Sequence, residues 1–286
     1  MDKQIVTRDG LTLRGREWPQ APARGTIVIV HGLGEHVGRY AHVAAFFNAR
    51  GWRVVGYDHR GHGRSDGARG RLAAVDDLLV DLAGAIDAVR AEHPGGPVVL
   101  LGHSLGGLVA ARFVAGGLAP PAAWSRPVDA LLLSSPVLDT AMSPVQKAML
   151  AVLGPLTPNQ AVANGLKPEW ISRDPAVVAA YTADPLVHDR IAPRLARFIV
   201  DGGAFVRAVA PRWTVPTLLL YAGADRCVPP AGSAAFAAAA PPAVVTARVY
   251  PALFHEIMNE PEQGEVLSAF AEGLDTLIAS PPRITP

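Results

Sequence analysis

Short apolar segments alternate with amphipathic ones along most of this 286-residue chain. The apolar segments are too continuous for strands with one exposed face, so we expect strands that are buried on both faces. They are Thr26–Val30, Arg53–Tyr57, Val98–Leu101, Ala130–Leu133, Thr217–Tyr221 and Val244–Tyr250. The helical segments are Tyr40–Arg50, Leu72–His93, Leu105–Ala115, Ala231–Ala240 and Glu262–Ala279. Strands that alternate with helices predict a mainly parallel sheet covered by helices on both faces.

The start of the chain has a different pattern. Residues 4–8 and 11–17 flank Asp9-Gly10, a dipeptide suited to a two-residue hairpin turn. The chain is therefore expected to begin with two antiparallel strands.

One long segment, residues 136–211, breaks the alternation, because it has many prolines and scattered helix-forming residues but no convincing strand. It falls between two buried strands and so should lie over the carboxyl ends of the sheet, where open α/β folds bind their ligands. We expect it to be a helical cap on a core formed by residues 1–135 and 212–286. Its apolar side chains, including Leu153 and Leu156, are expected to line a tunnel for an alkyl chain between cap and core.

A candidate nucleophile lies where a buried strand runs into a helix, in Gly102-His103-Ser104-Leu105-Gly106. This context fits a nucleophile elbow, a turn so tight that its serine is strained and the residues two positions away must be glycine. The turn lifts the hydroxyl clear and places it at the positive end of the helix dipole. Ser104 is therefore the candidate nucleophile of an α/β-hydrolase fold, with an accidental glycine-rich turn as the alternative.

A serine hydroxyl needs a base within hydrogen-bond reach. In this fold the chain order is nucleophile, acid, histidine, which leaves His188 and His255 among the nine histidines. His188 falls in the expected cap, whereas His255 follows a predicted strand, so we expect His255 to be the general base. Asp225 follows another buried strand and is expected to orient His255. The alternatives are a polar loop histidine and a turn-capping aspartate.

An oxyanion hole needs two backbone N–H groups, one directly after the nucleophile and one from the loop after an earlier strand. Leu105 follows Ser104, and Leu33 lies in the glycine-rich loop that follows the strand ending at Val30. We expect the N–H groups of Leu33 and Leu105 to bind the oxyanion. For the loop, the alternative is a turn without substrate contact.

Charge and composition bear on the substrate and the compartment. The chain has 26 basic and 25 acidic residues and a net charge of +1, so no sustained positive field favours nucleic acid. Cys227 is the only cysteine and cannot form an internal disulfide, and no apolar leader follows Met1. We therefore expect a cytoplasmic protein that acts on a small molecule and has no Cys-rich metal site.

Five motifs between residues 31 and 260 carry a resemblance to one known family. They are His31–Tyr40 (HGLGEHVGRY), Tyr57–Gly67 (YDHRGHGRSDG), Gly102–Gly107 (GHSLGG), Ala224-Asp225 and His255-Glu256. Together they resemble the monoacylglycerol lipase and lysophospholipase branch of the α/β-hydrolases. In the expected cap only Asp184-Pro185-Leu186 resembles that family.

The resemblance implies hydrolysis of monoacylglycerols or similar single-chain esters to fatty acid and alcohol through an acyl-enzyme, with no cofactor. In that family the glutamate and arginine of the oxyanion loop lie near the glycerol end of the substrate, which would assign substrate binding to Glu35 and Arg39. The alternative for this pair is an exposed i, i+4 ion pair. The expected partners are a lipid or other ester substrate and, transiently, a membrane surface contacted by the cap. The other functional hypotheses are a general carboxylesterase, a lysophospholipase, an aminopeptidase, an acyltransferase and a non-catalytic protein of the same fold.

Overall fold

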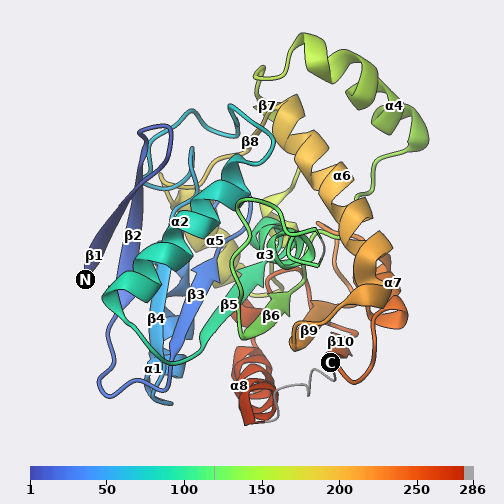
Figure 1. Cartoon of the computed structure of the whole chain (residues 1–286). Helices are drawn as coiled ribbons and strands as arrows, with labels where there is room; N and C mark the ends of the chain where they lie inside the picture. Colours follow the sequence, from blue (N-terminus) through green and yellow to red (C-terminus); the bar gives the residue numbers. More distant parts are fainter. Residues whose placement is uncertain (119, 280–286) are drawn as a thin grey trace.

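The computed structural model describes residues 1–118 and 120–279. In this part of the chain an eight-stranded sheet lies between two layers of helices (Figure 1). The strand order is β1-β2-β4-β3-β5-β6-β9-β10, antiparallel from β1 to β4 and parallel from there on. The bounds are β1 Asp2–Val6, β2 Thr12–Trp18, β3 Thr26–Val30, β4 Arg53–Tyr57, β5 Val98–His103, β6 Ala130–Ser134, β9 Thr217–Ala222 and β10 Val245–Tyr250.

The central strands are buried because successive side chains point to opposite helix layers. In β3, Ile27 and Ile29 belong to an apolar cluster with α1 and α8, whereas Val28 and Val30 belong to a second cluster with α2, α3 and α7. These helices are α1 Ala41–Asn48, α2 Asp77–Glu92, α3 Leu105–Ala115, α7 Pro230–Ala239 and α8 Gln263–Ala279. The continuous apolar segments of the sequence thus have two buried faces, and the expected α/β-hydrolase fold is confirmed.

Two predicted details are wrong, one at each edge of the sheet. Among the described residues β10 pairs with β9 alone, and its residues 246–249 are exposed and not buried on both faces. At the other edge, residues 7–11 join β1 to β2 in place of a two-residue turn. The Thr7 hydroxyl closes this longer loop, because it accepts a hydrogen bond of 2.9 Å from the N–H of Leu11 and donates one of 2.6 Å to Asp9.

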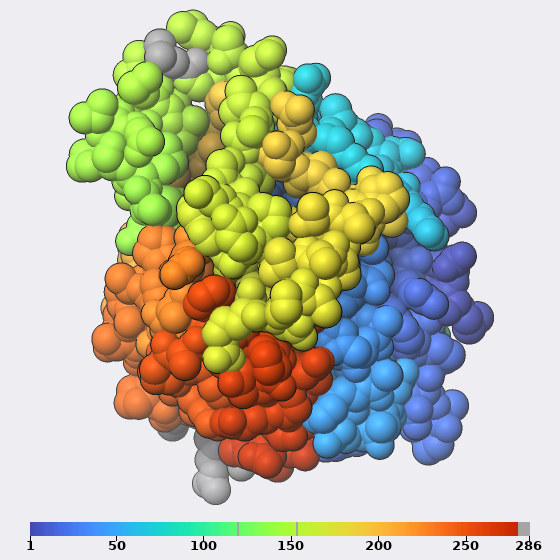
Figure 2. All heavy atoms as spheres, turned by 180° about the vertical axis from the view of Figure 1, so that it is seen from behind, coloured from blue at the N-terminus to red at the C-terminus, as the bar shows by residue number. Residues whose placement is uncertain are grey.

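The segment between β6 and β9 lies beyond the carboxyl ends of the strands (Figures 1 and 2). It contains α4 Pro144–Leu153, α5 Pro175–Ala183, α6 Pro193–Val209 and the paired strands β7 Val162–Ala163 and β8 Arg190–Ile191. Short 3-10 helices are η1 Val37–Tyr40, η2 Gly154–Leu156, η3 Pro168–Trp170, η4 Ala210–Arg212 and η5 Ile257–Asn259. The expectation of no strand in this segment is wrong, because two-residue strands are too short to produce a sequence pattern. Helix α6 also packs against α3, with Leu195, Phe198 and Val206 in the core.

Candidate active site

Ser104 lies in the sharp turn between β5 and α3, with backbone angles of φ 53° and ψ −118°. A non-glycine residue with positive φ is strained and is held there by its surroundings. The turn leaves no room for side chains beside it: a Cβ at Gly102 would lie 2.5 Å from the carbonyl oxygen of Gly106, and a Cβ at Gly106 would lie 1.9 Å from that of Val30. The two glycines are therefore required for the turn that presents the serine.

The structure brings Ser104, His255 and Asp225 together from three separate loops. The Ser104 Oγ lies 2.8 Å from His255 Nε2, and His255 Nδ1 lies 2.7 Å from Asp225 Oδ2. The carboxylate can only accept, so Nδ1 carries the proton and Nε2 is free to accept the serine hydroxyl proton. Asp225 Oδ1 accepts two hydrogen bonds of 2.8 Å, from the N–H groups of Cys227 and Val228. These bonds fix the carboxylate that orients the imidazole.

The electrostatics of His255 suit a base. Burial alone would lower its pKa, but the negative charge of Asp225 and the hydrogen bond to it, together with Glu256 and Glu35, raise the pKa above its ordinary value. An imidazolium at this position would be stabilised by the same charges.

The N–H groups of Leu33 and Leu105 have no hydrogen-bond acceptor within the described part of the chain. Leu105 is the first residue of α3, where the dipole of the helix favours negative charge. The neighbouring N–H of Gly32 is not available, because it donates to Glu35 Oε1 at 2.6 Å. The two N–H groups expected from the sequence are thus both unpaired beside Ser104.

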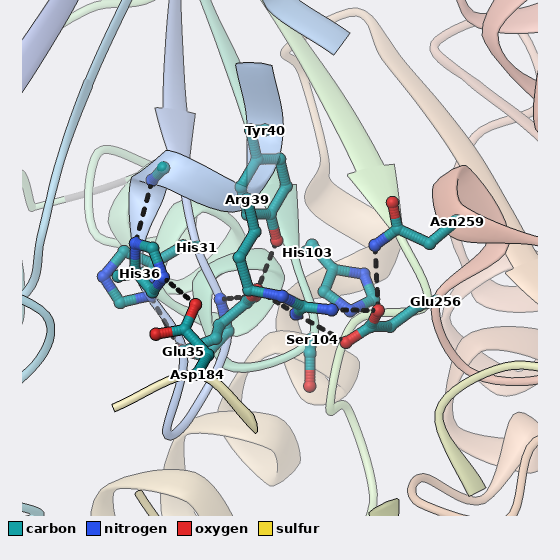
Figure 3. A network of polar contacts seen from close by, with 12 residues as sticks. His31, Glu35, His36, Arg39, Tyr40, His103, Ser104, Asp184, Glu256 and Asn259 are labelled. Atoms are coloured by element: carbon teal, nitrogen blue, oxygen red, sulfur yellow. Dashed lines mark hydrogen bonds and ion pairs between the residues drawn. The ribbon is translucent and has the colours of Figure 1, made fainter. Parts of the chain in front are cut away.

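Glu35 and Arg39 form part of a buried network (Figure 3). Arg39 Nη1 donates to Glu35 Oε2 at 2.6 Å and to Glu256 Oε1 at 2.7 Å, and Nη2 donates to Glu256 Oε2 at 2.7 Å. The second oxygen of Glu35 accepts from the Tyr40 hydroxyl at 2.6 Å. Burial alone would raise the pKa of Glu35, but the Arg39 guanidinium and the hydrogen bond from Tyr40 hold it below its ordinary value. The expected i, i+4 ion pair is present, but it is buried and not exposed, because the loop after β3 turns it toward the loop that carries His255.

The sequence did not predict the contacts between the loop after β3 and residues 181–188, which belong to the segment between β6 and β9. The N–H of His188 donates to the carbonyl oxygen of Gly34 at 2.8 Å, and His36 Nε2 lies 2.8 Å from Asp184 Oδ2. Tyr181 places its ring 4.8 Å from the Arg39 guanidinium. The one available signal was the resemblance of Asp184-Pro185-Leu186, and long-range contacts of this kind leave no periodic pattern in a sequence.

Two cavities meet at Ser104 and Leu33. One, of about 430 Å³, has many ionisable side chains among its lining residues, and we call it the polar cavity. It is formed by residues that include Glu35, Lys167, Tyr181, Asp184, His188, Asp189, His255 and Glu256. The other, of about 330 Å³, has a mainly apolar lining. It is formed by residues that include Leu105, Val137, Met142, Ile191, Ile199, Val200 and Val228.

Two residues of the segment between β6 and β9, Leu153 and Leu156, were expected to line a tunnel. Leu156 is 77% exposed and lines neither cavity, so the expectation that it faces a tunnel is wrong. The side chain of Leu153 lies outside the described residues. The apolar cavity is instead lined by Met142 and by residues of α6 such as Ile199, which also packs in the core.

Several ionisable groups around the site are neutral. Burial lowers the pKa of His31, His103 and His188 to about 4, so these imidazoles carry no charge near pH 7. Burial and the negative charge of Asp225 raise the pKa of Cys227, which disfavours a thiolate nucleophile. Side-chain ligand atoms of Asp225, Cys227 and His255 lie within 4.8 Å of one another, a spacing that a metal ion could bridge. However, the carboxylate and both imidazole nitrogens already have hydrogen-bond partners.

Comparisons with known proteins agree with this geometry. Residues 21–262 match the model of the family described as serine aminopeptidase, S33. A monoacylglycerol lipase from Mycolicibacterium smegmatis is 40% identical over 252 residues, which cover 87% of each chain. The phospholipase YtpA of Bacillus subtilis is 30% identical, over 88% of this chain and 95% of its own. The crystal structure of a Paleococcus ferrophilus monoacylglycerol lipase superposes with a TM-score of 0.81 at 34% identity, over 93% of this chain and 99% of that one.

Proposed function

Since this chain belongs to the monoacylglycerol lipase family of serine α/β-hydrolases, we propose that it hydrolyses monoacylglycerols and similar single-chain esters, with Ser104 as its nucleophile. That it is an ester hydrolase of the monoacylglycerol lipase type follows from the family. The observation that carries the finer proposal is the position of Ser104, whose hydroxyl is hydrogen-bonded to His255 where a polar and an apolar cavity meet. A single-chain ester has the same division into a polar head and an apolar tail.

The proposed mechanism is acyl transfer in two steps. His255 accepts the proton of Ser104 as Oγ attacks the ester carbonyl, and the N–H groups of Leu33 and Leu105 stabilise the oxyanion. The imidazolium then protonates the leaving alcohol, and an acyl-enzyme remains. Water, deprotonated by His255, then attacks the acyl carbonyl, and the imidazolium returns the proton to Ser104 Oγ as the fatty acid leaves. Asp225 holds the imidazole in the required tautomer throughout.

The acyl chain is assigned to the apolar cavity and the glycerol to the polar one. Each buried methylene of the chain contributes up to ~0.8 kcal/mol, which favours a fatty ester over a short one. Glu35 lines the polar cavity and is proposed to accept a hydrogen bond from a glycerol hydroxyl. Arg39 contributes to substrate binding indirectly, because it holds the carboxylates of Glu35 and Glu256 in place. Glu35→Gln should therefore reduce turnover of a monoacylglycerol more than that of a p-nitrophenyl ester of equal chain length.

A substrate panel tests the proposal against its rivals. Fatty-acid release is measured from a monoacylglycerol, a p-nitrophenyl fatty ester and a lysophospholipid, and amino-acid release is measured from an aminoacyl amide. The proposal requires the monoacylglycerol to have the highest kcat/KM among the natural esters. A flat profile would favour a general carboxylesterase, preference for the lysophospholipid a lysophospholipase, and cleavage of the amide an aminopeptidase. Transfer of the acyl group to added glycerol in preference to water would identify an acyltransferase.

Lipid esters are the substrate class of its relatives. For this chain we propose that the lipid ester is taken from a membrane surface. Helix α4 and η2 expose an apolar stripe at helical spacing, formed by Val145, Met149, Val152 and Leu156. No helix in the described ranges has the length and apolar character needed to cross a bilayer. We propose that this stripe touches the membrane surface transiently. A cytoplasmic location remains a prediction from the sequence.

A further inference from the structure

The polar cavity beside Ser104 has an unbalanced charge. Its lining includes the carboxylates of Glu35, Asp184, Asp189 and Glu256, whereas Lys167 is the one cationic side chain of the lining among the described residues. The histidines that could offset this charge, His103 and His188, are kept neutral by burial, with pKa values of about 4. Carboxylates therefore outnumber cations where a leaving group would lie.

Neighbouring cations reduce this excess without removing it. Arg39 neutralises one charge of the Glu35–Glu256 pair, because one guanidinium is shared by two carboxylates. Asp184 faces His36, and Asp189 faces the exposed side chain of Arg190 at 3.3 Å. Asp225, hydrogen-bonded to the neutral form of His255, adds a further negative charge just behind the site.

Two groups near Ser104 respond to a negative potential, whereas at His188 the pKa is lowered by burial and by the positive charge of Arg69, which acts in the opposite sense. Burial alone would lower the pKa of His255, yet the surrounding carboxylates raise it above the ordinary value. Burial raises the pKa of the Tyr181 hydroxyl, and the charges of Glu35 and Glu256 raise it further. A cationic group is thus favoured, and an anionic group disfavoured, in the part of this cavity beside Glu35 and Glu256.

We propose that the polar cavity selects leaving groups by charge, so that this chain hydrolyses fatty-acyl esters of cationic amino alcohols as well as those of glycerol and discriminates against esters whose leaving group carries a phosphate. The inference rests on the proposed function and extends it to a further substrate class. The reaction is unchanged: the ester C–O bond breaks, water adds to the acyl group, and a fatty acid and an amino alcohol leave. The same potential repels the fatty-acid carboxylate and so favours its release.

The test uses three lauroyl esters that differ only in the leaving group: lauroylcholine (cationic), 1-lauroylglycerol (neutral) and 1-lauroylglycerol 3-phosphate (anionic). Fatty-acid release is measured at low salt and below the micelle concentration. We expect kcat/KM for lauroylcholine to match or exceed that for the glycerol ester, and kcat/KM for the phosphate ester to be lower by at least about 10-fold. At about 1 M NaCl, where the Debye length is roughly 3 Å, the choline-to-phosphate ratio should fall.

Asp189 and Asp201 provide a matched pair of variants. Both side chains are about equally exposed (60% and 62%) and each lies 3.3 Å from an arginine, but only Asp189 lines the polar cavity. Asp189→Asn should lower the choline-to-phosphate ratio several-fold at low salt, and Asp201→Asn should leave it unchanged. Absence of lauroylcholine hydrolysis, equal rates on choline and phosphate esters, or equal effects of the two variants would overturn the inference. If the glycerol ester alone were not hydrolysed, the proposed function would fail while the charge selection still stood.

Discussion

The N–H of His188 donates a 2.8 Å hydrogen bond to the carbonyl oxygen of Gly34, which attaches the oxyanion loop to the segment before α6. Gly34 follows Leu33 and has a φ of +77°, and a Cβ there would lie 2.2 Å from the carbonyl oxygen of His188. Gly34→Ala is therefore expected to displace the loop and misplace the Leu33 N–H. We expect kcat to fall by about 10²–10³-fold, the usual effect of losing one oxyanion donor.

Gly165→Ala is the control for this change. Gly165 lies between β7 and η3 and has the same φ of +77°, but no atom of the described residues lies within 4 Å of a Cβ built there. Both variants should lose about 1–3 kcal/mol of stability from backbone strain, measured by urea unfolding, while only Gly34→Ala loses activity. Equal kcat losses would show that the contact with His188 does not position the oxyanion loop.

The acyl-chain profile should depend on the apolar cavity and not on the exposed stripe. Ile199 lines that cavity, whereas Leu156 lies outside it. Ile199→Trp is expected to shift the preferred chain by several carbons toward shorter esters, because the indole fills volume that the chain would occupy. Leu156→Trp should leave the preference unchanged. The measurement is kcat/KM across a series of p-nitrophenyl esters, and a shift caused by Leu156→Trp alone would place the acyl chain elsewhere.

The exposed apolar stripe on α4 and η2 should instead affect binding of the protein to a lipid surface. Met149 and Val152 are 54% and 70% exposed, and burying such side chains in lipid is worth up to ~1.5–3 kcal/mol each. The double replacement by serine is expected to weaken sedimentation with neutral vesicles at least several-fold and to leave hydrolysis of a soluble short-chain ester intact. Val249→Ser, on the edge strand β10, is the control. Unaltered vesicle binding in the double variant would contradict membrane contact through α4.

The pH profile should report the raised pKa of His255. The active form has a neutral imidazole, so kcat/KM falls as pH decreases through this pKa, and the midpoint should lie above the ordinary value of ~6.5. Asp225→Asn removes the charge that raises the pKa. It should move the midpoint to lower pH and reduce kcat by about 10⁴-fold, as a wrong tautomer does in serine hydrolases. An unshifted midpoint in this variant would show that Asp225 does not set the pKa.

Much of the fold could be predicted because the physical causes are local. Buried parallel strands such as β3 need apolar side chains on both faces, and the turn at Ser104 needs glycines, so both leave a direct record in the sequence. At the edge the rule fails: β10 is rich in β-branched residues but also contains Arg248, and among the described residues β9 is its one partner strand. Edge position follows from the order of strands in the sheet, which composition does not reveal.

The residues of the candidate site also differ in how far the sequence could predict their positions. Ser104, Asp225 and His255 each follow a predicted strand, and parallel topology brings the ends of those strands together. The sequence indicated Glu256 only as part of the His255-Glu256 motif, because its partner Arg39 lies 217 residues away. The bond between Gly34 and His188 depends on how one loop packs on another, which no local pattern encodes.

The most direct test of the account is hydrolysis of a monoacylglycerol by Ser104→Ala beside the wild type, with both proteins checked for folding and freed of contaminating esterase. Triad members act as a unit, so the variant is expected to lose at least about 10³-fold in kcat. It should also fail to take up a fluorophosphonate that labels the wild type at one site. Retention of more than a small percentage of wild-type turnover would contradict the assignment of Ser104 as the nucleophile.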